Sequence, residues 1–198
     1  MTLRISLIIA LVCGLFAYSF GQLPAAEKAA SDRVLAKIRK IELYNQILPV
    51  LMTPAQLKVI LPIIEKHRAE AVKLEKLEHD ELKKLETSLD PAIKAAEEKG
   101  ELPSEVLMKR GVSLFHGFLI LRKALVDDSV DQLMKAMKAN LNEGQIKAAA
   151  NAFNPAIFLT TMKLEELTDD KKLDYWIRIV LMDNAAYDIL LELSRKRS

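Results

Sequence analysis

Glycine and proline are scarce in this chain, with six glycines and seven prolines among 198 residues. Because both residues end or bend regular elements, their scarcity predicts few, long elements. Between these residues, apolar side chains recur at every third or fourth position, which is the spacing of one helix face. The longest such run contains Leu57, Ile60, Ile64, Ala71, Leu74, Leu77, Leu82, Leu85 and Leu89. No segment alternates strictly enough to predict a strand. The sequence therefore predicts an all-α fold of long antiparallel helices in hairpins, a helical bundle with extra C-terminal helices.

Capping and turn residues set the predicted helix boundaries. A first helix is expected over residues 31–48, and Pro49 ends it. A second helix starts at Thr53-Pro54 and should bend at Pro62. The remaining signals are a restart at Asp90-Pro91 into a short helix ending at Gly100, a long helix from Pro103-Ser104-Glu105 to about Ala139, a start at Asn142, an interruption at Asn154-Pro155, and a last helix after Thr168.

The first residues have the features of a secretory signal peptide. Arg4 precedes an apolar run over residues 5–20, and Ser19-Phe20-Gly21 places small residues three and one positions before Gln22. This pattern predicts a signal peptide over residues 1–21. One alternative is a membrane anchor that stays uncleaved, although a spanning helix needs roughly 20 apolar residues. Another is lipidation of Cys13, although Val12 before it is not small. We expect a periplasmic or secreted protein.

The chain after the predicted cleavage point narrows the function classes. Residues 22–30 are small and polar and predict a flexible lead-in, and residues 31–198 are expected to form a single all-helical domain. Removal of Cys13 leaves no cysteine, which excludes disulfides, thiol catalysis and cysteine-based zinc sites. A formal net charge of +2 for the whole chain lacks the clustered basic excess of a nucleic-acid-binding protein.

One short motif occurs twice. Met52-Thr53-Pro54-Ala55-Gln56 and Leu141-Asn142-Glu143-Gly144-Gln145 share an apolar residue, a capping residue, two spacers and a glutamine. The capping side chain can accept from a free amide of the first helical turn, and the glutamine can reach back to the amide of the capping residue. A single copy is common in helical proteins. Leu167-Thr168-Asp169-Asp170-Lys171 has a third, degenerate copy of the pattern, with lysine in place of glutamine.

The two copies resemble the LTXXQ motif of the Spy/CpxP family. Met52 replaces the first leucine in one copy, and Asn142 replaces threonine in the other while retaining a capping side chain. The resemblance covers only these two motifs, the export signal and the helical pattern. It implies a periplasmic helical protein, mostly dimeric in this family, that holds partly unfolded proteins without ATP or tunes envelope-stress signalling. The C-terminal helices have no clear counterpart in that family.

No enzyme motif is present, whether a phosphate-binding loop, a nucleophile elbow or a zinc-binding His-Glu-x-x-His. We therefore expect no catalytic residues, no cofactor and no metal site. The histidines are His67, His79 and His116, and the Glu-x-x-His pairs of di-iron bundles are missing. Glu75 and His79, one helical turn apart, keep a metal-sensing function as an alternative, although a surface pair is the simpler interpretation. Met134 and Met137 are expected to fill the core.

These patterns together predict an exported, ATP-independent protein that binds other polypeptides, as a chaperone or an envelope-stress modulator. The alternatives are the metal-sensing protein and a purely structural envelope protein. Residues 112–126 are apolar on nearly every side, so that segment needs neighbours all round. Either the C-terminal residues Phe153, Phe158, Trp176 and Ile177 cover it, or a second copy does. We expect a homodimer, with no nucleic acid partner and no membrane span after cleavage.

Overall fold

The computed structural model describes residues 24–152 and 166–196. Within these ranges every regular element is helical, so the all-α prediction is confirmed. The elements are α2 (Ala25–Ile47), η1 (Leu48–Val50), α3 (Pro54–Lys99), α4 (Glu105–Asn140), α5 (Glu143–Ala152), α6 (Asp169–Trp176), the π-helical segment η4 (Ile177–Leu181) and α7 (Asn184–Lys196). No described helix combines the length and apolar character that a membrane crossing requires.

Contacts group the chain into two units, residues 1–39 and residues 40–198, and α2 passes through the boundary. The described part of the first unit is helical from Ala25 onward. The second unit begins inside the domain predicted for residues 31–198. The predicted signal peptide and its cleavage point lie outside the described residues.

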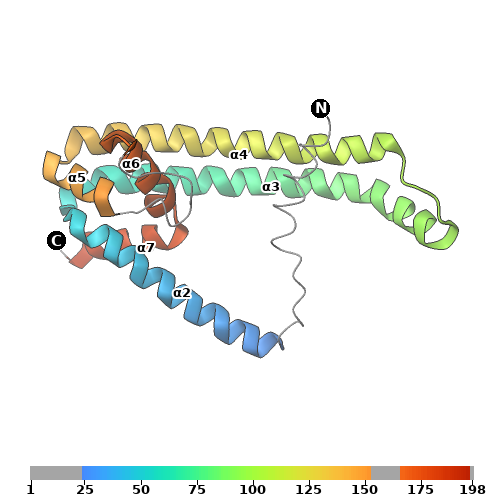
Figure 1. Cartoon of the computed structure of the whole chain (residues 1–198), viewed down its shortest axis with the longest axis horizontal. Helices are drawn as coiled ribbons and strands as arrows, with labels where there is room; N and C mark the ends of the chain where they lie inside the picture. The colour runs from blue at the N-terminus through green and yellow to red at the C-terminus, as the bar shows by residue number, and fades with distance from the viewer. Residues whose placement is uncertain (1–23, 153–165, 197–198) are drawn as a thin grey trace. The chain divides into compact units, whose positions relative to one another are not determined.

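The second unit is built on an antiparallel hairpin of α3 and α4 (Figure 1). The two helices contain 46 and 36 residues, so they extend roughly 70 and 55 Å. Side chains of one row along α3, each partly or fully shielded, follow alternating steps of three and four residues, as in a heptad seam. They are Leu57, Ile60, Ile64, His67, Ala71, Leu74, Glu78, Glu81, Leu85, Ser88, Ala92 and Ala95.

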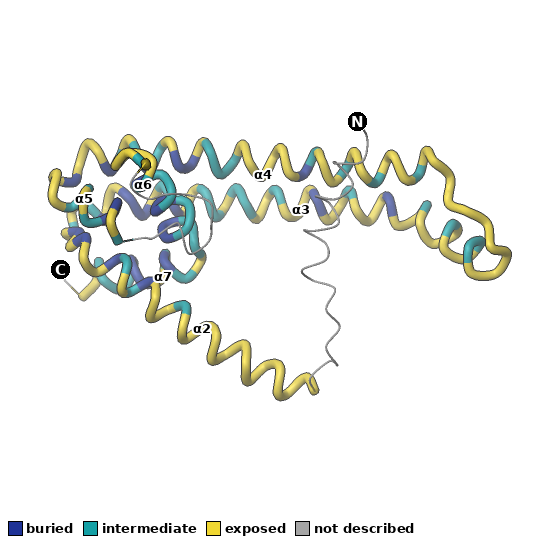
Figure 2. Tube along the Cα trace, viewed as in Figure 1, coloured by how far each residue is buried: buried dark blue, intermediate teal, exposed yellow. Residues whose placement is uncertain are grey.

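Among the described residues, other helices pack on one end of this hairpin. There η1, α5, α6, η4 and α7 pack on α3, α4 and one another, and we call this part, with residues 40–47 of α2, the proximal bundle. Its core unites buried side chains from all these elements, including Leu43, Ile60, Leu133, Trp176 and Ile189. We call residues 71–125 the distal arm, which consists of the two helices and their connection. Figure 2 shows that buried residues concentrate in the proximal bundle.

Helix α2 begins earlier than the sequence analysis predicts. Residues 25–30, expected to be flexible, form the first turns of α2, and the carbonyl of Pro24 accepts from the amides of Glu27 and Lys28. The physical reason is composition. Four of these six residues are alanine, which has the highest helix propensity. A run of small side chains therefore favours a helix here and does not indicate a flexible segment.

Two further boundaries differ from the prediction. Helix α3 continues through Pro91 to Lys99, so the expected restart at Asp90-Pro91 is wrong. A proline inside a helix removes one hydrogen bond, but Leu85 and Ala92 on either side remain shielded on the seam, and this packing maintains the helix. The last predicted helix is divided into α6, η4 and α7, because the chain widens into a π-turn after Trp176 and turns at Met182. Asn154-Pro155 lies outside the described residues.

Candidate protein-binding surface

The two copies of the repeated motif cap α3 and α5. The backbone amide of Gln56 donates to Thr53 Oγ1 at 3.3 Å, and the backbone amide of Thr53 donates to Gln56 Oε1 at 2.8 Å. The Gln145 amide donates to Asn142 Oδ1 at 2.9 Å, and the Asn142 amide donates to Gln145 Oε1 at 3.1 Å. The apolar residues that precede the caps, Met52 and Leu141, are both buried. Each motif thus has the reciprocal bonds of a capping box. The degenerate copy retains half of this pattern, since Thr168 Oγ1 accepts from the Lys171 amide at 3.3 Å.

The structure also brings the two glutamines together, which the sequence analysis did not predict. Gln56 Nε2 donates to Gln145 Oε1 at 2.9 Å, and Gln145 Nε2 donates to Gln56 Oε1 at 3.0 Å. Gln56 Nε2 also donates to the Asn140 carbonyl at 2.9 Å, and Gln145 Nε2 to the Leu51 carbonyl at 3.1 Å. Both N–H groups of each glutamine side chain are therefore used as donors. The arrangement has approximate local two-fold symmetry. We call this arrangement the glutamine clasp.

The clasp gives the motif a structural role at the end of the hairpin that is opposite the α3–α4 connection. It ties the start of α3 to the start of α5, and its polar atoms are satisfied within the chain. Leu51 beside it has a φ of 51°, the left-handed region that costs a non-glycine residue free energy. Its carbonyl accepts from Gln145, and this bond helps to hold the unusual conformation.

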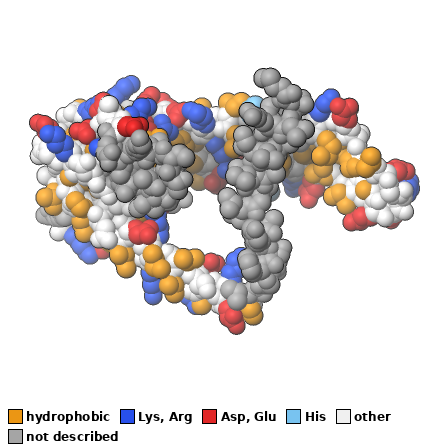
Figure 3. Space-filling model, in the orientation of Figure 1, with side chains coloured by type: hydrophobic (Ala, Val, Ile, Leu, Met, Phe, Trp, Pro, Cys, Tyr) orange, Lys and Arg blue, Asp and Glu red, His pale blue; other side chains and the backbone are white. Residues whose placement is uncertain are grey.

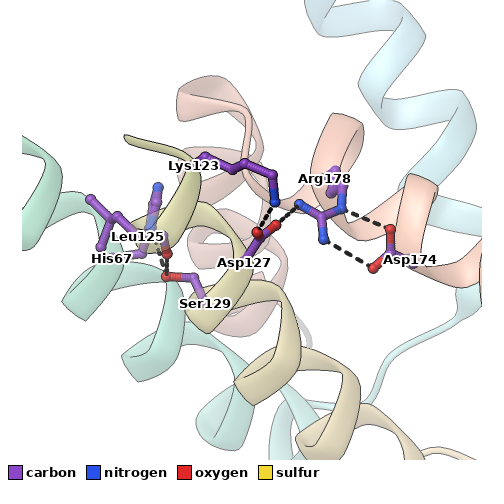
Figure 4. A network of polar contacts seen from close by, with 7 residues as sticks. All are labelled: His67, Lys123, Leu125, Asp127, Ser129, Asp174 and Arg178. Atoms are coloured by element: carbon purple, nitrogen blue, oxygen red, sulfur yellow. Dashed lines mark hydrogen bonds and ion pairs between the residues drawn. The ribbon is translucent and has the colours of Figure 1, made fainter. Parts of the chain in front are cut away.

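Ion pairs also join neighbouring helices, and two of them involve partly or fully buried carboxylates. The buried carboxylate of Glu78 accepts from Arg122 Nε at 2.7 Å and also from Nη2, and these bonds lower the pKa of Glu78. Arg178 of η4 donates to Asp127 of α4 at 2.7 Å, and Lys123 also donates to Asp127 (Figure 4). Both cations lower the pKa of the Asp127 carboxyl, with Lys123 the larger cause.

His67 lies in the seam at the border between the proximal bundle and the distal arm. Its Nδ1 is 2.8 Å from Ser129 Oγ, and the Ser129 hydroxyl donates to the Leu125 carbonyl at 2.8 Å (Figure 4). Since that hydroxyl proton is committed to Leu125, Ser129 accepts from His67, and Nδ1 carries a proton. Partial burial lowers the pKa of His67, and the charge of Glu70 opposes this shift in part.

The residues weighed as metal ligands do not converge. Glu75 and His79 are exposed on the distal arm, and His116 is exposed on α4. Across residues 24–152 and 166–196, no three His, Cys, Asp or Glu side chains are grouped closely enough to hold a metal ion. Met137 is buried and Met134 is partly buried, and both pack into the proximal core.

The main surface feature of the distal arm is apolar. In α4, the shielded positions Leu107, Gly111, Leu114 and Phe118 face α3, and the residue after each one is exposed. In α3, the residues after the shielded Glu81, Ser88 and Ala92 are exposed in the same way. In an antiparallel helix pair, positions that follow the seam on both helices lie on the same side. They form one surface, the distal apolar face, made of Leu82, Leu89, Ile93, Met108, Val112, Phe115 and Leu119.

The exposed fractions of the side chains show how far residues 112–126 are covered within one chain. Phe115 remains 59% exposed and Leu119 66% exposed. Trp176 and Ile177 lie instead in the proximal core with Val130 and Leu133, and of this segment Val126 packs against that core. Phe153 and Phe158 lie outside the described residues. Figure 3 shows hydrophobic side chains gathered near the free end of the arm, with charged side chains at its tip.

An open pocket of about 510 Å³ lies at the free end of the arm, and none of the seven residues of the distal apolar face lines it. It lies between α3 and α4, where the seam residues are the small Ser88, Ala92 and Ala95. Leu102 and Arg110 also line it. Small side chains leave the space between two helices unfilled, so the pocket is a consequence of the seam composition.

Comparison with known proteins identifies no relative of this chain. No family model, curated protein or solved structure matches the chain.

Proposed function

We propose that this chain is an exported protein that binds other polypeptides without ATP through its distal apolar face. The observation that supports the proposal most directly is the number of exposed apolar side chains on one side of the arm. Seven large apolar side chains from two helices share this side, all of them exposed. Clusters of exposed apolar side chains are typical of interaction sites.

The surroundings of the face suit a partner that is itself partly unfolded. The surface of the arm carries positive and negative side chains close together, as in the ion pairs Lys94–Glu98, Lys99–Glu101 and Lys109–Glu105. Mixed charges keep such a surface soluble and speed encounter, and apolar contact then retains the partner. The resemblance of the capped motifs to the Spy/CpxP family supports the same proposal. In this interpretation the motifs hold the fold together and the distal arm meets the partner.

Suppression of aggregation tests the proposal. A chemically unfolded protein is diluted into buffer without ATP, and light scattering is followed with and without the chain at an equimolar ratio. We expect the parent to reduce scattering and Leu82→Glu to reduce it less, because a charge then interrupts the face. Leu77→Glu is the matched control, since Leu77 is exposed on the opposite side of α3. Equal activity of the two variants, or no suppression by the parent, would contradict the proposal.

A further inference from the structure

Helix α2 carries an exposed apolar row that the proposed function does not use. Val34, Ile38 and Ile41 follow steps of four and three residues, so they lie on one side of the helix. Each of them is at least 48% exposed, and Leu35 beside them is 61% exposed. Leu43, which is buried in the proximal core, follows Val34 by nine residues, or about two and a half turns. The apolar row therefore lies on the side of α2 opposite to its buried residue.

A row of basic side chains runs beside the apolar row. Arg33, Lys37 and Lys40 each directly precede one residue of the apolar row, so they follow the same steps, and all three are exposed. Lys40 Nζ also lies 5.9 Å from the centroid of the Tyr44 ring. Helix α2 contains five basic and three acidic residues, so this helix alone has the formal net charge of +2 that the whole chain has. Positive charge is thus concentrated on α2 and balanced in the rest of the chain.

The acidic residues of α2 do not interrupt the two rows. Asp32 precedes Ile41 by nine residues and so lies on the opposite side of the helix. Glu27 lies before the first residue of the rows, and Glu42 follows the last one. Residues 33–41 therefore contain four basic residues, four large aliphatic residues and no acidic residue.

These two rows suit a surface that has negative charge above an apolar layer. At a bilayer with anionic phospholipids, an amphipathic helix lies in the plane of the interface, and its apolar side enters the boundary between headgroups and acyl chains. The long stems of lysine and arginine let their charges stay among the phosphate groups. Protein interfaces depend on aromatic anchors, and the apolar row of α2 has only aliphatic side chains of similar size. The composition therefore favours a uniform acyl layer over an acidic polypeptide.

We propose that residues 33–41 of α2 bind the surface of a membrane that contains anionic phospholipids, with the helix in the plane of the interface. The basic row neutralises headgroup phosphates, and the apolar row enters the acyl boundary. Few apolar residues take part, so the binding is reversible. The site shares no residue with the distal apolar face, and this inference does not depend on the proposed function.

Sedimentation with vesicles tests the proposal on the exported chain, with mass spectrometry to verify that all variants begin at the same residue. The parent should bind vesicles of equal parts phosphatidylglycerol and phosphatidylethanolamine at least about 10-fold more tightly than vesicles of phosphatidylcholine, because only the former are anionic. Ile38→Glu should weaken binding to the anionic vesicles at least about 10-fold, since it places a charge in the acyl boundary. Ala36→Glu adds the same charge on nearly the opposite side of α2 and should weaken binding less than about 3-fold.

Both of these positions are exposed, so neither substitution should unfold the chain. A parent that does not bind the anionic vesicles, or an equal loss in Ile38→Glu and Ala36→Glu, would overturn the proposal.

Removal of two positive charges tests the basic row. Lys37→Gln combined with Lys40→Gln should weaken binding to the anionic vesicles about 10-fold at low salt. Lys73→Gln combined with Lys83→Gln removes the same charge from exposed positions of α3 and should weaken binding less than about 3-fold. Equal weakening would show that only net charge matters. Leu82→Glu should bind vesicles as the parent does, and a loss of vesicle binding in that variant would assign the contact to the distal apolar face and overturn the proposal.

A fluorescent label on a single cysteine, in a Cys13→Ser background, tests the orientation of the helix. With anionic vesicles, the emission of a polarity-sensitive label at Val34→Cys should shift to shorter wavelengths, because the label leaves water. The same label at Ala36→Cys should change little, since that position faces away from the apolar row. Equal shifts at the two positions would contradict the orientation. A shift at Val34→Cys with polyglutamate, and none with vesicles, would identify an acidic polypeptide as the partner and overturn the membrane proposal.

Discussion

The two ends of the α3–α4 hairpin differ in what covers the same pair of helices. In the proximal bundle, α3 and α4 have further helices on their outer faces, and side chains such as Ile60 and Leu133 are completely buried. In the distal arm the seam continues, but only Glu78, Leu85 and Phe118 of its side chains are buried. A two-helix layer shields one stripe of each helix and leaves its other apolar residues in water. The comparison therefore separates a part whose apolar side chains stabilise the fold from a part whose apolar side chains largely remain exposed.

The difference between the two parts is tested most directly by removing one large apolar side chain from each part and comparing the loss in the free energy of unfolding. Trp176 is completely buried in the proximal core, so Trp176→Ala should lower the free energy of unfolding by about 3–5 kcal/mol. Phe115→Ala should change it by less than about 0.5 kcal/mol, because Phe115 is already exposed. Urea denaturation, at a protein concentration too low for self-association, measures both values. Similar losses would show that the arm has a cover of its own.

The ion pair between Glu78 and Arg122 is the exception in the arm, because it is polar and buried in part. Arg122→Gln should lower the free energy of unfolding by about 2 kcal/mol, since it weakens the bonds to the buried Glu78 carboxylate. Lys109→Gln is the control, because its pair with Glu105 is exposed on both sides. Thermal unfolding of the three proteins at pH 7 makes the comparison. An equal effect of the two variants would mean that burial of Glu78 does not matter.

The sequence predicted the starts of several helices and their caps, because these depend on neighbouring residues. It failed where contacts between residues far apart in the sequence determine the structure. The starts of α3, α4 and α6 follow from Thr53, Ser104 and Thr168, because capping is local chemistry. The continuation through Pro91 depends on packing along the seam, which a local rule cannot include. The polar composition of α3 likewise hid the fact that Glu78 is buried by a partner 44 residues away.

The candidate surface shows the same division. The apolar excess of residues 112–126 is visible in the sequence and predicted a missing neighbour. The sequence did not show that Trp176 lies in the proximal core and not on this segment. The glutamine clasp was hidden for a similar reason, because two motifs 89 residues apart carry no sign that they meet.

The glutamine clasp extends the comparison to the end of the hairpin that lies in the proximal bundle. Gln56→Ala should lower the free energy of unfolding by about 1–2 kcal/mol, since it removes the capping bond and the bonds to Gln145 and Asn140. Gln145→Ala should cost a similar amount. The double variant should cost less than the sum by about 0.5–1 kcal/mol, because the pair is lost with either glutamine. Strict additivity in denaturation experiments would show that the two motifs act separately.

The smallest expected effect lies at the border of the two parts, where His67 makes stability depend on pH. Burial holds the pKa of His67 below its ordinary value of 6.5, so the unfolded chain binds the proton more tightly than the folded one. The free energy of unfolding should therefore be highest above pH 6.5 and should decline as pH falls below that value. The carboxyls of Glu78 and Asp127, whose pKa values are lowered, lose their stabilising charge only at more acidic pH.

Two substitutions isolate this contribution. His67→Gln retains a donor for Ser129 and does not titrate, so the decline of stability between pH 7 and pH 5 should be shallower than in the parent. Glu70→Gln should make the decline steeper, because the charge of Glu70 raises the pKa of His67 and its loss lowers that pKa further. Urea denaturation at several pH values measures all three slopes. If both substitutions shift the slope in the same direction, the seam histidine is not the group that titrates, and the border between bundle and arm has no pH dependence of its own.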